Sequence, residues 1–250
     1  MYKEYRTKGG SPESWAEVFL PGATTLPTFT EAALRGNRYW REIRARLAPG
    51  ASVIDAGSGL GAWVRFLNAA GYRARGVDYS PEMHARLARE APEVDWILGD
   101  IRAIPVPDAS IDAVISWGVI EHDEAGPDAA LREFHRVVKP GGWIFVSVPI
   151  DTYEHRYASM VQTDDPGPAG AFFQYLFKPR EIADVVARAG FDIDLAEPCG
   201  RHPALLAPRL CLSLQSAPRI VHKIGFGVLS RVASLTPRAD NMVLVVGRRR

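Results

Sequence analysis

The segment VIDAGSGLG at 53–61 constrains the fold of this chain more than any other. An apolar, strand-like run ends in Asp55 and passes into closely spaced glycines, and the WVRFLNAAG that follows has the composition of a helix. Glycines let a backbone turn sharply and approach a ligand, while the first N–H groups of a helix face that ligand unpaired. Strand, glycine turn and helix together predict a nucleotide-type pocket on a parallel sheet.

The chemistry of the expected ligand depends on the acid in this segment. Gly57, Gly59 and Ala62 fit the loose dinucleotide pattern G-x-G-x-x-G/A. Asp55, however, stands two residues before the first glycine, where a carboxylate suits an ammonium group better than a phosphate. The glycine pattern alone is a weak signal, so the ligand has to be inferred from the other strand ends.

The bulk composition is that of an ordinary globular protein. A chain of 250 residues with 47% hydrophobic content is long enough for one domain over 1–250. Thirty basic and 29 acidic residues leave a formal charge of +1, so we expect no nucleic-acid partner. Two cysteines cannot form a disulfide framework, the start MYKEYRTKGG has no apolar leader, and no apolar run reaches the roughly 20 residues of a membrane span. We therefore expect a cytoplasmic protein.

Helical and strand-like patterns alternate at short intervals from residue 30 to 150, which is typical of parallel strands joined by crossover helices. We expect an N-terminal helical region over 1–49 and a cofactor-binding core over 50–150. The predicted helices are 30–48, 61–70, one capped by Ser80-Pro81, and 127–138, ended by a turn at 139–142; the predicted strands are 51–56, 73–79, 96–100, 111–117 and 143–149.

The pattern changes after residue 150. Pro, Gly and aromatic residues over 151–177 predict a long lid-like connection, in which Tyr153, His155 and Tyr157 are candidates to line an acceptor site. A helix at 178–191 and strands at 191–196 and 241–247 follow.

Residues 201–239 form a basic insertion with six Arg or Lys residues and no acid, and they predict two short helices with apolar faces. The favoured interpretation is a helix pair packed on the sheet or at a homodimer contact, so the chain is expected to be a monomer or a homodimer. The alternative is a cover that recognises an anionic or lipid-linked acceptor or makes peripheral contact with a membrane.

Acidic or polar side chains follow the ends of four successive predicted strands. Because the carboxyl ends of parallel strands meet at one edge of the sheet, these groups are expected to lie around one ligand. A carboxylate about 20 residues after the glycines is placed to accept hydrogen bonds from ribose hydroxyls. The residues are Asp55, Asp78, Asp100 and, beyond the fourth strand, Ser116, Glu121 and His122.

Four motifs in this order, DAGSGLG, GVDYSPEM, GDIRAIPVPDASIDAVISWGVIEH and VVKPGGWIFVSVP, make the chain similar to the class I S-adenosylmethionine-dependent methyltransferases. The resemblance covers about 50–196. It implies a Rossmann-like, doubly wound α/β fold with helices on both faces of a seven-stranded, mostly parallel sheet whose last strand is antiparallel. S-adenosylmethionine is the cofactor that it implies.

The resemblance also assigns cofactor contacts by position. The glycine loop would surround the methionine end of the cofactor, the acid after the second strand would hold the ribose, and residues near the second and third strands would enclose the adenine. The residues so implied are Asp55, Gly57, Ser58 and Gly59 for the methionine end, Asp78 for the ribose, Tyr79, Met83, Asp100 and Ile101 for the adenine, and Ser116, whose backbone would face the cofactor's amino group.

The chemistry of the cofactor agrees with this rim of acids. S-adenosylmethionine carries a sulfonium and an ammonium but no phosphate, and methyl transfer by in-line displacement requires few catalytic side chains. His122 is the candidate general base, because an imidazole pKa near 6.5 suits proton removal at neutral pH; a purely structural role stays open. No metal is expected, because Glu121, Asp123 and Glu124 are more typical of a solvated turn.

The expected function is methyl transfer to a small-molecule acceptor, with a hydroxyl of a metabolite, sugar or lipid-linked compound favoured. Two alternatives stay open. One is an NAD-dependent oxidoreductase on the same class of sheet, in which the acids at the strand ends would have no role. The other is a noncatalytic cofactor-binding subunit that has kept the pocket without the acceptor site.

Overall fold

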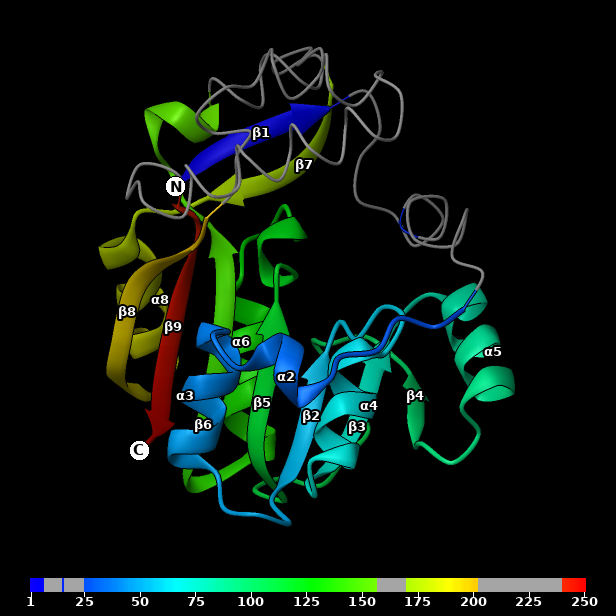
Figure 1. The fold of residues 1–250 in the computed structure, drawn as a ribbon. Helices are drawn as coiled ribbons and strands as arrows, with labels where there is room; N and C mark the ends of the chain where they lie inside the picture. Colours follow the sequence, from blue (N-terminus) through cyan, green and yellow to red (C-terminus); the bar gives the residue numbers. More distant parts are fainter. Residues whose placement is uncertain (7–14, 16–24, 157–169, 202–239) are drawn as a thin grey trace.

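The computed structural model describes residues 1–6, 15, 25–156, 170–201 and 240–250 and contains a seven-stranded sheet. The strand order is β4-β3-β2-β5-β6-β9-β8, and only β9 runs against its neighbours (Figure 1). This is the predicted fold class, with the antiparallel last strand in the expected place. The strands are β2 (Ser52–Ala56), β3 (Arg73–Asp78), β4 (Trp96–Leu98), β5 (Ile111–Trp117), β6 (Val138–Pro149), β8 (Phe191–Arg201) and β9 (Asp240–Arg249).

Helices cover both faces of the sheet, because successive strand residues point to opposite sides. Val53 of β2 belongs to the cluster that packs against one layer of helices, and the next residue, Ile54, belongs to the cluster on the other face. The first layer holds α3 (Arg38–Arg46) and α4 (Ala62–Ala69), and the second holds α6 (Asp128–Val137) and α8 (Pro179–Arg188). None of the described helices is long and apolar enough to cross a bilayer.

The start of α5 (Pro81–Glu90) follows the expected capping chemistry. The Ser80 side chain accepts a hydrogen bond from the N–H of Met83, and Pro81 occupies the first helical position. This cap directly follows the end of β3, so it fixes where the chain leaves the sheet beside Asp78.

The expectation of an N-terminal helical region over 1–49 is wrong in two respects. Residues Tyr2–Arg6 form a strand, β1, which pairs antiparallel with β7 (Ala171–Leu176) in a separate two-stranded sheet. The two tyrosines of YKEYR have high β-propensity, and the rings of Tyr5 and Phe172 meet with centroids 6.3 Å apart.

The helix predicted over 30–48 is also interrupted. It is two helices, α2 (Glu31–Leu34) and α3, because the Asn37 side chain accepts a hydrogen bond from the N–H of Trp40 and starts a new helix there.

Two other boundaries differ from the sequence-based expectation. β6 already begins at Val138 and continues through the expected turn at 139–142, where Gly141 has φ 76° and the pairing with β5 is irregular between Ile111 and Ala113. The lid-like connection 151–177 contains β7, whose pairing partner lies at the other end of the chain. The predicted insertion 201–239 lies outside the described residues except for Arg201, and the single-domain assignment stays a prediction.

Candidate functional site

A cavity of about 580 Å³ lies at the carboxyl ends of β2, β3, β4 and β5. It is lined by every predicted site residue except Ser116, and additionally by residues from the N-terminal part of the chain and from 117–124. The predicted residues that it brings together are Asp55, Gly57, Ser58, Gly59, Asp78, Tyr79, Met83, Asp100, Ile101 and His122.

Two buried carboxyls stand side by side at the ends of β2 and β3. Asp55 is 3% exposed and Asp78 is 9% exposed. Burial, with the negative charge of Asp78 as a second cause, raises the pKa of Asp55 to about 8. A ligand that carries positive charge would therefore favour the ionised form of Asp55, whereas a phosphate would not.

Asp78 also shapes the glycine turn. One carboxylate oxygen accepts a hydrogen bond from the N–H of Gly59 at 2.8 Å, and the other accepts from the N–H of Ser80 at 3.0 Å. Burial raises the pKa of Asp78 and these backbone donors oppose that effect. The same side chain thus joins the loop after β2 to the cap of α5.

The glycine turn is close to the segment beyond β5. Gly57 has φ +85°, and a β-carbon at that position would lie 2.5 Å from Cγ2 of Val119. The hydroxyl of Ser58 is buried without a hydrogen-bond partner in the described residues and lies against Gly76 of β3. A side chain larger than hydrogen at Gly57 would displace the wall of the cavity that Val119 forms.

The third acid, Asp100, is engaged by a residue that the sequence did not single out. Arg102 donates to both Asp100 oxygens, at 2.6 to 3.0 Å, and bridges to Asp123 at 3.0 Å. The Arg102 guanidinium lowers the pKa of Asp100. Asp100 therefore stays ionised as a hydrogen-bond acceptor, and Arg102 itself lines the cavity. The position of Arg102, two residues after Asp100 in the sequence Asp-Ile-Arg, is the signal from which this ion pair could have been predicted.

Ser116 does not line the cavity. Its side chain is fully buried, and its hydroxyl donates to the carbonyl of Ala56 at 3.0 Å, which ties β5 to the end of β2. The predicted contact was through the Ser116 backbone, so that prediction stays open.

His122 ends the short 3-10 helix η1 (Ile120–His122) at the far end of the cavity. Its Nδ1 lies 2.7 Å from the carbonyl oxygen of Phe173 in β7, so Nδ1 donates and Nε2 keeps its lone pair. Burial, with Arg6 as the main charged contributor, lowers the pKa of His122 to about 4. The expected pKa near 6.5 is therefore wrong: the imidazole is neutral at pH 7 and is a weaker base than an exposed one.

Aromatic side chains enclose the His122 end, and two of them, Trp15 and Phe173, come from segments that carry no motif. The ring of Trp15 packs edge-on against His122 with centroids 4.7 Å apart, and the ring of Phe173 does so at 5.0 Å. Trp117 lines the cavity and stacks on Tyr39 of α3 at 4.5 Å. Of the aromatics predicted in the lid, Tyr153 is 77% exposed and Tyr157 lies outside the described residues; neither Tyr153 nor His155 lines the cavity.

In the described parts of the chain, no three His, Cys, Asp or Glu side chains converge as metal ligands. The acids considered for that role point to other partners. Asp123 is bound to Arg102, and Glu124 pairs with Lys3 at 3.5 Å.

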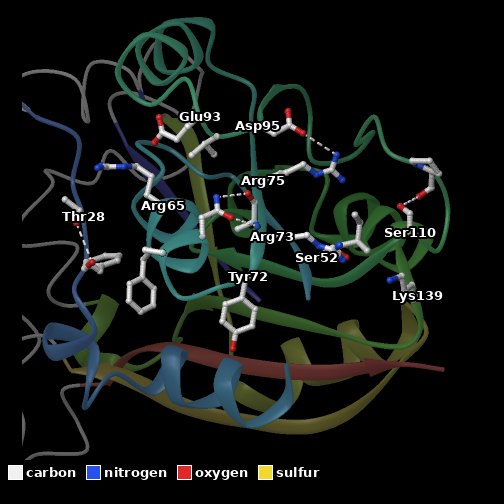
Figure 2. A pocket seen from close by; sticks show the side chains of 18 residues that line it. Thr28, Ser52, Arg65, Tyr72, Arg73, Arg75, Glu93, Asp95, Ser110 and Lys139 are labelled. Atoms are coloured by element: carbon white, nitrogen blue, oxygen red, sulfur yellow. Dashed lines mark hydrogen bonds and ion pairs between the residues drawn. The ribbon is translucent and has the colours of Figure 1, made fainter. Parts of the chain in front are cut away.

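A second, more open cavity of about 940 Å³ lies near the amino ends of β2, β3 and β5 (Figure 2). Its basic side chains are largely engaged: Arg75 pairs with Asp95 at 3.6 Å, Lys139 pairs with Asp112 at 2.6 Å, and Arg65 donates to the carbonyl of Pro27 at 3.0 Å. It contains no predicted site residue and lies away from the strand ends where ligands of such sheets bind. The cavity with Asp55 and His122 is therefore the candidate site.

The chain is similar in sequence to known methyltransferases. The family model described as a methyltransferase domain matches residues 54–146. A probable S-adenosylmethionine-dependent methyltransferase of Mycolicibacterium smegmatis is 30% identical over 199 residues, which are 74% of this chain and 70% of that protein. The ubiquinone/menaquinone biosynthesis C-methyltransferase UbiE of Rubrivivax gelatinosus is 39% identical over 111 residues, 42% of this chain and 43% of that protein.

Among solved structures, the 1,6-didemethyltoxoflavin-N1-methyltransferase of Burkholderia thailandensis, crystallised with S-adenosylhomocysteine and 1,6-didemethyltoxoflavin, has a TM-score of 0.58. It is 17% identical, and the alignment covers 98% of this chain and 93% of that chain. At this identity the likeness shows the fold alone.

Proposed function

Because the chain belongs to the S-adenosylmethionine-dependent methyltransferase family, we propose that it transfers the methyl group of that cofactor to a hydroxyl of a small molecule. Family membership replaces the two alternatives drawn from the sequence, an NAD-dependent oxidoreductase and a noncatalytic subunit. Two of the proteins named above are a C-methyltransferase and an N1-methyltransferase, so the acceptor atom is argued from this chain's own residues.

The cofactor half of the proposal rests on the charge of the cavity. Bound S-adenosylmethionine supplies an electrophilic methyl group on a positively charged sulfur. Asp55 would bind its ammonium, Asp78 its ribose hydroxyls, and Asp100 its adenine amine, while Ile101 and Tyr79 would pack on the adenine. Burial raises the pKa of Asp55, and a nearby cation would favour release of its proton, which supports this assignment.

The acceptor half rests on His122. Its Nδ1 proton is held by the carbonyl of Phe173, so Nε2 is the nitrogen that can receive a proton. In the proposed step a lone pair of the acceptor oxygen forms the bond to the methyl carbon, sulfur keeps the electron pair of the broken bond, and the hydroxyl proton moves to Nε2. The single observation that carries the proposal is the presence of the acids and this imidazole in one cavity.

The decisive experiment begins with the cofactor. Isothermal calorimetry and thermal shifts with S-adenosylmethionine, S-adenosylhomocysteine and NAD should show binding of the first two, with a stabilisation of a few kcal/mol at ligand concentrations well above Kd. Formation of S-adenosylhomocysteine is then measured against mixtures of hydroxylated, amine and carbon acceptors. Turnover only with amines would overturn the hydroxyl assignment, and the absence of cofactor binding would overturn the proposal as a whole.

For residues 201–239 the packed helix pair is the interpretation favoured by the sequence, and we propose as the alternative that their six Arg and Lys residues contribute to recognition of an anionic or lipid-linked acceptor. Replacing Arg209, Arg219 and Lys223 by Gln should then weaken acceptor binding and association with anionic liposomes in a salt-dependent way. Unchanged acceptor kinetics and no liposome binding by the wild type would leave these residues a structural role. The cytoplasmic location, the absence of a nucleic-acid partner and the monomeric or homodimeric state stay predictions.

A further inference from the structure

Glu121, in the middle of η1, is a buried acid to which the proposed reaction gives no role. Its side chain is 1% exposed, and its Oε2 has no hydrogen-bond partner in the described residues. Its Oε1 lies 3.8 Å from Nε2 of His122, the nitrogen that the Phe173 contact leaves free. A buried carboxylate oxygen without a hydrogen-bond partner is costly, so Oε2 points to a use of Glu121 in the site.

The carboxyl lies just behind the wall of the cavity. Gly118 lines the cavity, and a β-carbon at Gly118 would lie 3.4 Å from Oε1 of Glu121. Because Gly118 has no side chain, only backbone atoms separate the Glu121 carboxyl from the part of the cavity that would hold the acceptor. An acceptor hydroxyl bound to Nε2 of His122 would therefore stand close to Oε1 as well.

The groups that surround this pair come from several elements. The charges of Arg6 and Glu4 in β1 interact electrostatically with His122, and the charge of Glu121 interacts in the same way with the hydroxyl of Tyr39 in α3. The hydroxyl of Tyr175 in β7 donates a hydrogen bond to the carbonyl of the nearby Glu124 at 2.8 Å. Among the basic side chains in the described part of the chain, His122 is the one that comes within 4.0 Å of the Glu121 carboxyl. Burial raises the pKa of Glu121 to about 8, while it lowers that of His122 to about 4. Burial therefore favours the neutral form of both neighbours.

Resting on the proposed function, we propose that Glu121 is a positioning residue for His122, whose ionised carboxylate stabilises the imidazolium formed when the acceptor proton reaches Nε2. The methyl group is transferred without the electron pair of its bond to sulfur, which stays on sulfur. The acceptor oxygen supplies the pair for the new bond, and the proton of the acceptor hydroxyl becomes the second N–H proton of His122. A carboxylate beside that nitrogen raises the basicity of the imidazole. Release of the proton to solvent restores the pair.

This arrangement fixes the direction of the pH dependence. Below about pH 8 Glu121 carries its proton and contributes little, and above it the carboxylate assists His122. The wild-type kcat should therefore rise through this range. Glu121→Gln should lower kcat about tenfold to a hundredfold at pH 9 but less than about twofold at pH 6.5, with KM for S-adenosylmethionine nearly unchanged.

An NMR titration tests the pair without any acceptor. In the full chain labelled at histidine, the His122 imidazole signal is assigned by its loss in His122→Ala. The chemical shift of this signal should change with pH and show an inflection near pH 8 that reports the ionisation of Glu121. The inflection should vanish in Glu121→Gln but persist in Glu121→Asp, which keeps a carboxyl. Glu31→Gln, at an exposed position of α2, is the matched control and should keep it.

The outcomes separate this inference from the function it rests on. A wild-type His122 signal without the inflection, or an inflection retained in Glu121→Gln, overturns the role of Glu121 even if the enzyme methylates hydroxyls. Failure to bind S-adenosylmethionine, with the inflection intact, overturns the proposed function instead. If Glu121→Gln does not fold, the wild type and Glu121→Asp still decide the question.

Discussion

The glycine-loop end of the cavity and its His122 end are assembled from different kinds of segment. At the loop end each acid lies at or just beyond the carboxyl end of a strand, and Asp78 accepts hydrogen bonds from N–H groups two and nineteen residues away in the sequence. At the other end His122 is held by the carbonyl of Phe173, 51 residues further along, and enclosed by Trp15 from the start of the chain. The first end is local in sequence and polar, whereas the second is long-range and mostly aromatic.

In the proposed function, this contrast separates cofactor binding from acceptor chemistry. The acids of the polar end would bind the charged and hydroxyl groups of S-adenosylmethionine, and His122 would act on the acceptor. At the aromatic end the ring of His122 packs against Phe173 of β7, and β1 and β7 form a two-stranded sheet outside the seven-stranded sheet (Figure 1). Substitutions at the two ends should therefore affect different kinetic constants.

The largest effect is expected at the aromatic end. His122→Ala should lower kcat about 10² to 10⁴-fold with a hydroxyl acceptor, while calorimetry finds the affinity for S-adenosylmethionine unchanged. His135→Ala is the matched control, because His135 packs on Phe191 away from the cavity. A loss below about threefold would assign His122 a structural role, and a parallel loss of cofactor affinity would break the separation of the two ends.

A smaller effect is expected from Asp78→Ala at the polar end. Loss of hydrogen bonds to a charged acceptor should weaken cofactor binding by about 1.5 to 3 kcal/mol. Because the carboxylate also accepts from Gly59 and Ser80, the melting temperature should fall as well. Asp100→Ala is the comparison, since Asp100 is 39% exposed and should cost less. Equal affinities for the two variants would remove Asp78 from the ribose site.

A pair of glycine substitutions tests the contact between the two ends. Gly57 and Gly59 both have positive φ, but only at Gly57 would a β-carbon meet Val119, at 2.5 Å. Gly57→Ala should therefore reduce the free energy of unfolding by about 1 to 3 kcal/mol more than Gly59→Ala. Denaturant titration measures the difference. Equal losses would mean that Val119 moves aside without cost.

The smallest expected effect is the pH dependence of cofactor binding. Asp55 must lose its proton to bind an ammonium, so below its pKa of about 8 the Kd for S-adenosylmethionine should rise as pH falls, by up to about tenfold per unit. Calorimetry between pH 6 and 7.5 measures this. Asp55→Asn should bind more weakly and without this slope. A flat wild-type profile would show that Asp55 is ionised before the cofactor arrives.

The sequence predicted the polar end well because each residue there belongs to a short motif. Asp55 and Asp78 follow apolar strands within a few residues of glycine or a helix cap, and parallel strands bring such ends together. It missed Arg102, although this residue stands two positions after Asp100, because an arginine in such a segment is usually in solvent.

The aromatic end of the cavity could not be predicted from the sequence, for a physical reason. The pairing of Tyr2–Arg6 with Ala171–Leu176 and the contact of Trp15 with His122 join residues more than a hundred positions apart, and no local pattern records them. The pKa of His122 follows from that enclosure, so a residue type alone predicted a value near 6.5 where burial lowers it to about 4.

The pairing of β1 with β7 also has a consequence for the order of events during synthesis. The residues of β1 leave the ribosome first, yet their partner strand emerges only after the cofactor-binding strands β2 to β6 have been made. The sheet that supplies the Phe173 carbonyl is thus completed late, and the nascent chain can acquire a cofactor pocket before it has an oriented imidazole. The imidazole would be oriented only after every strand end that lines the cavity has been made.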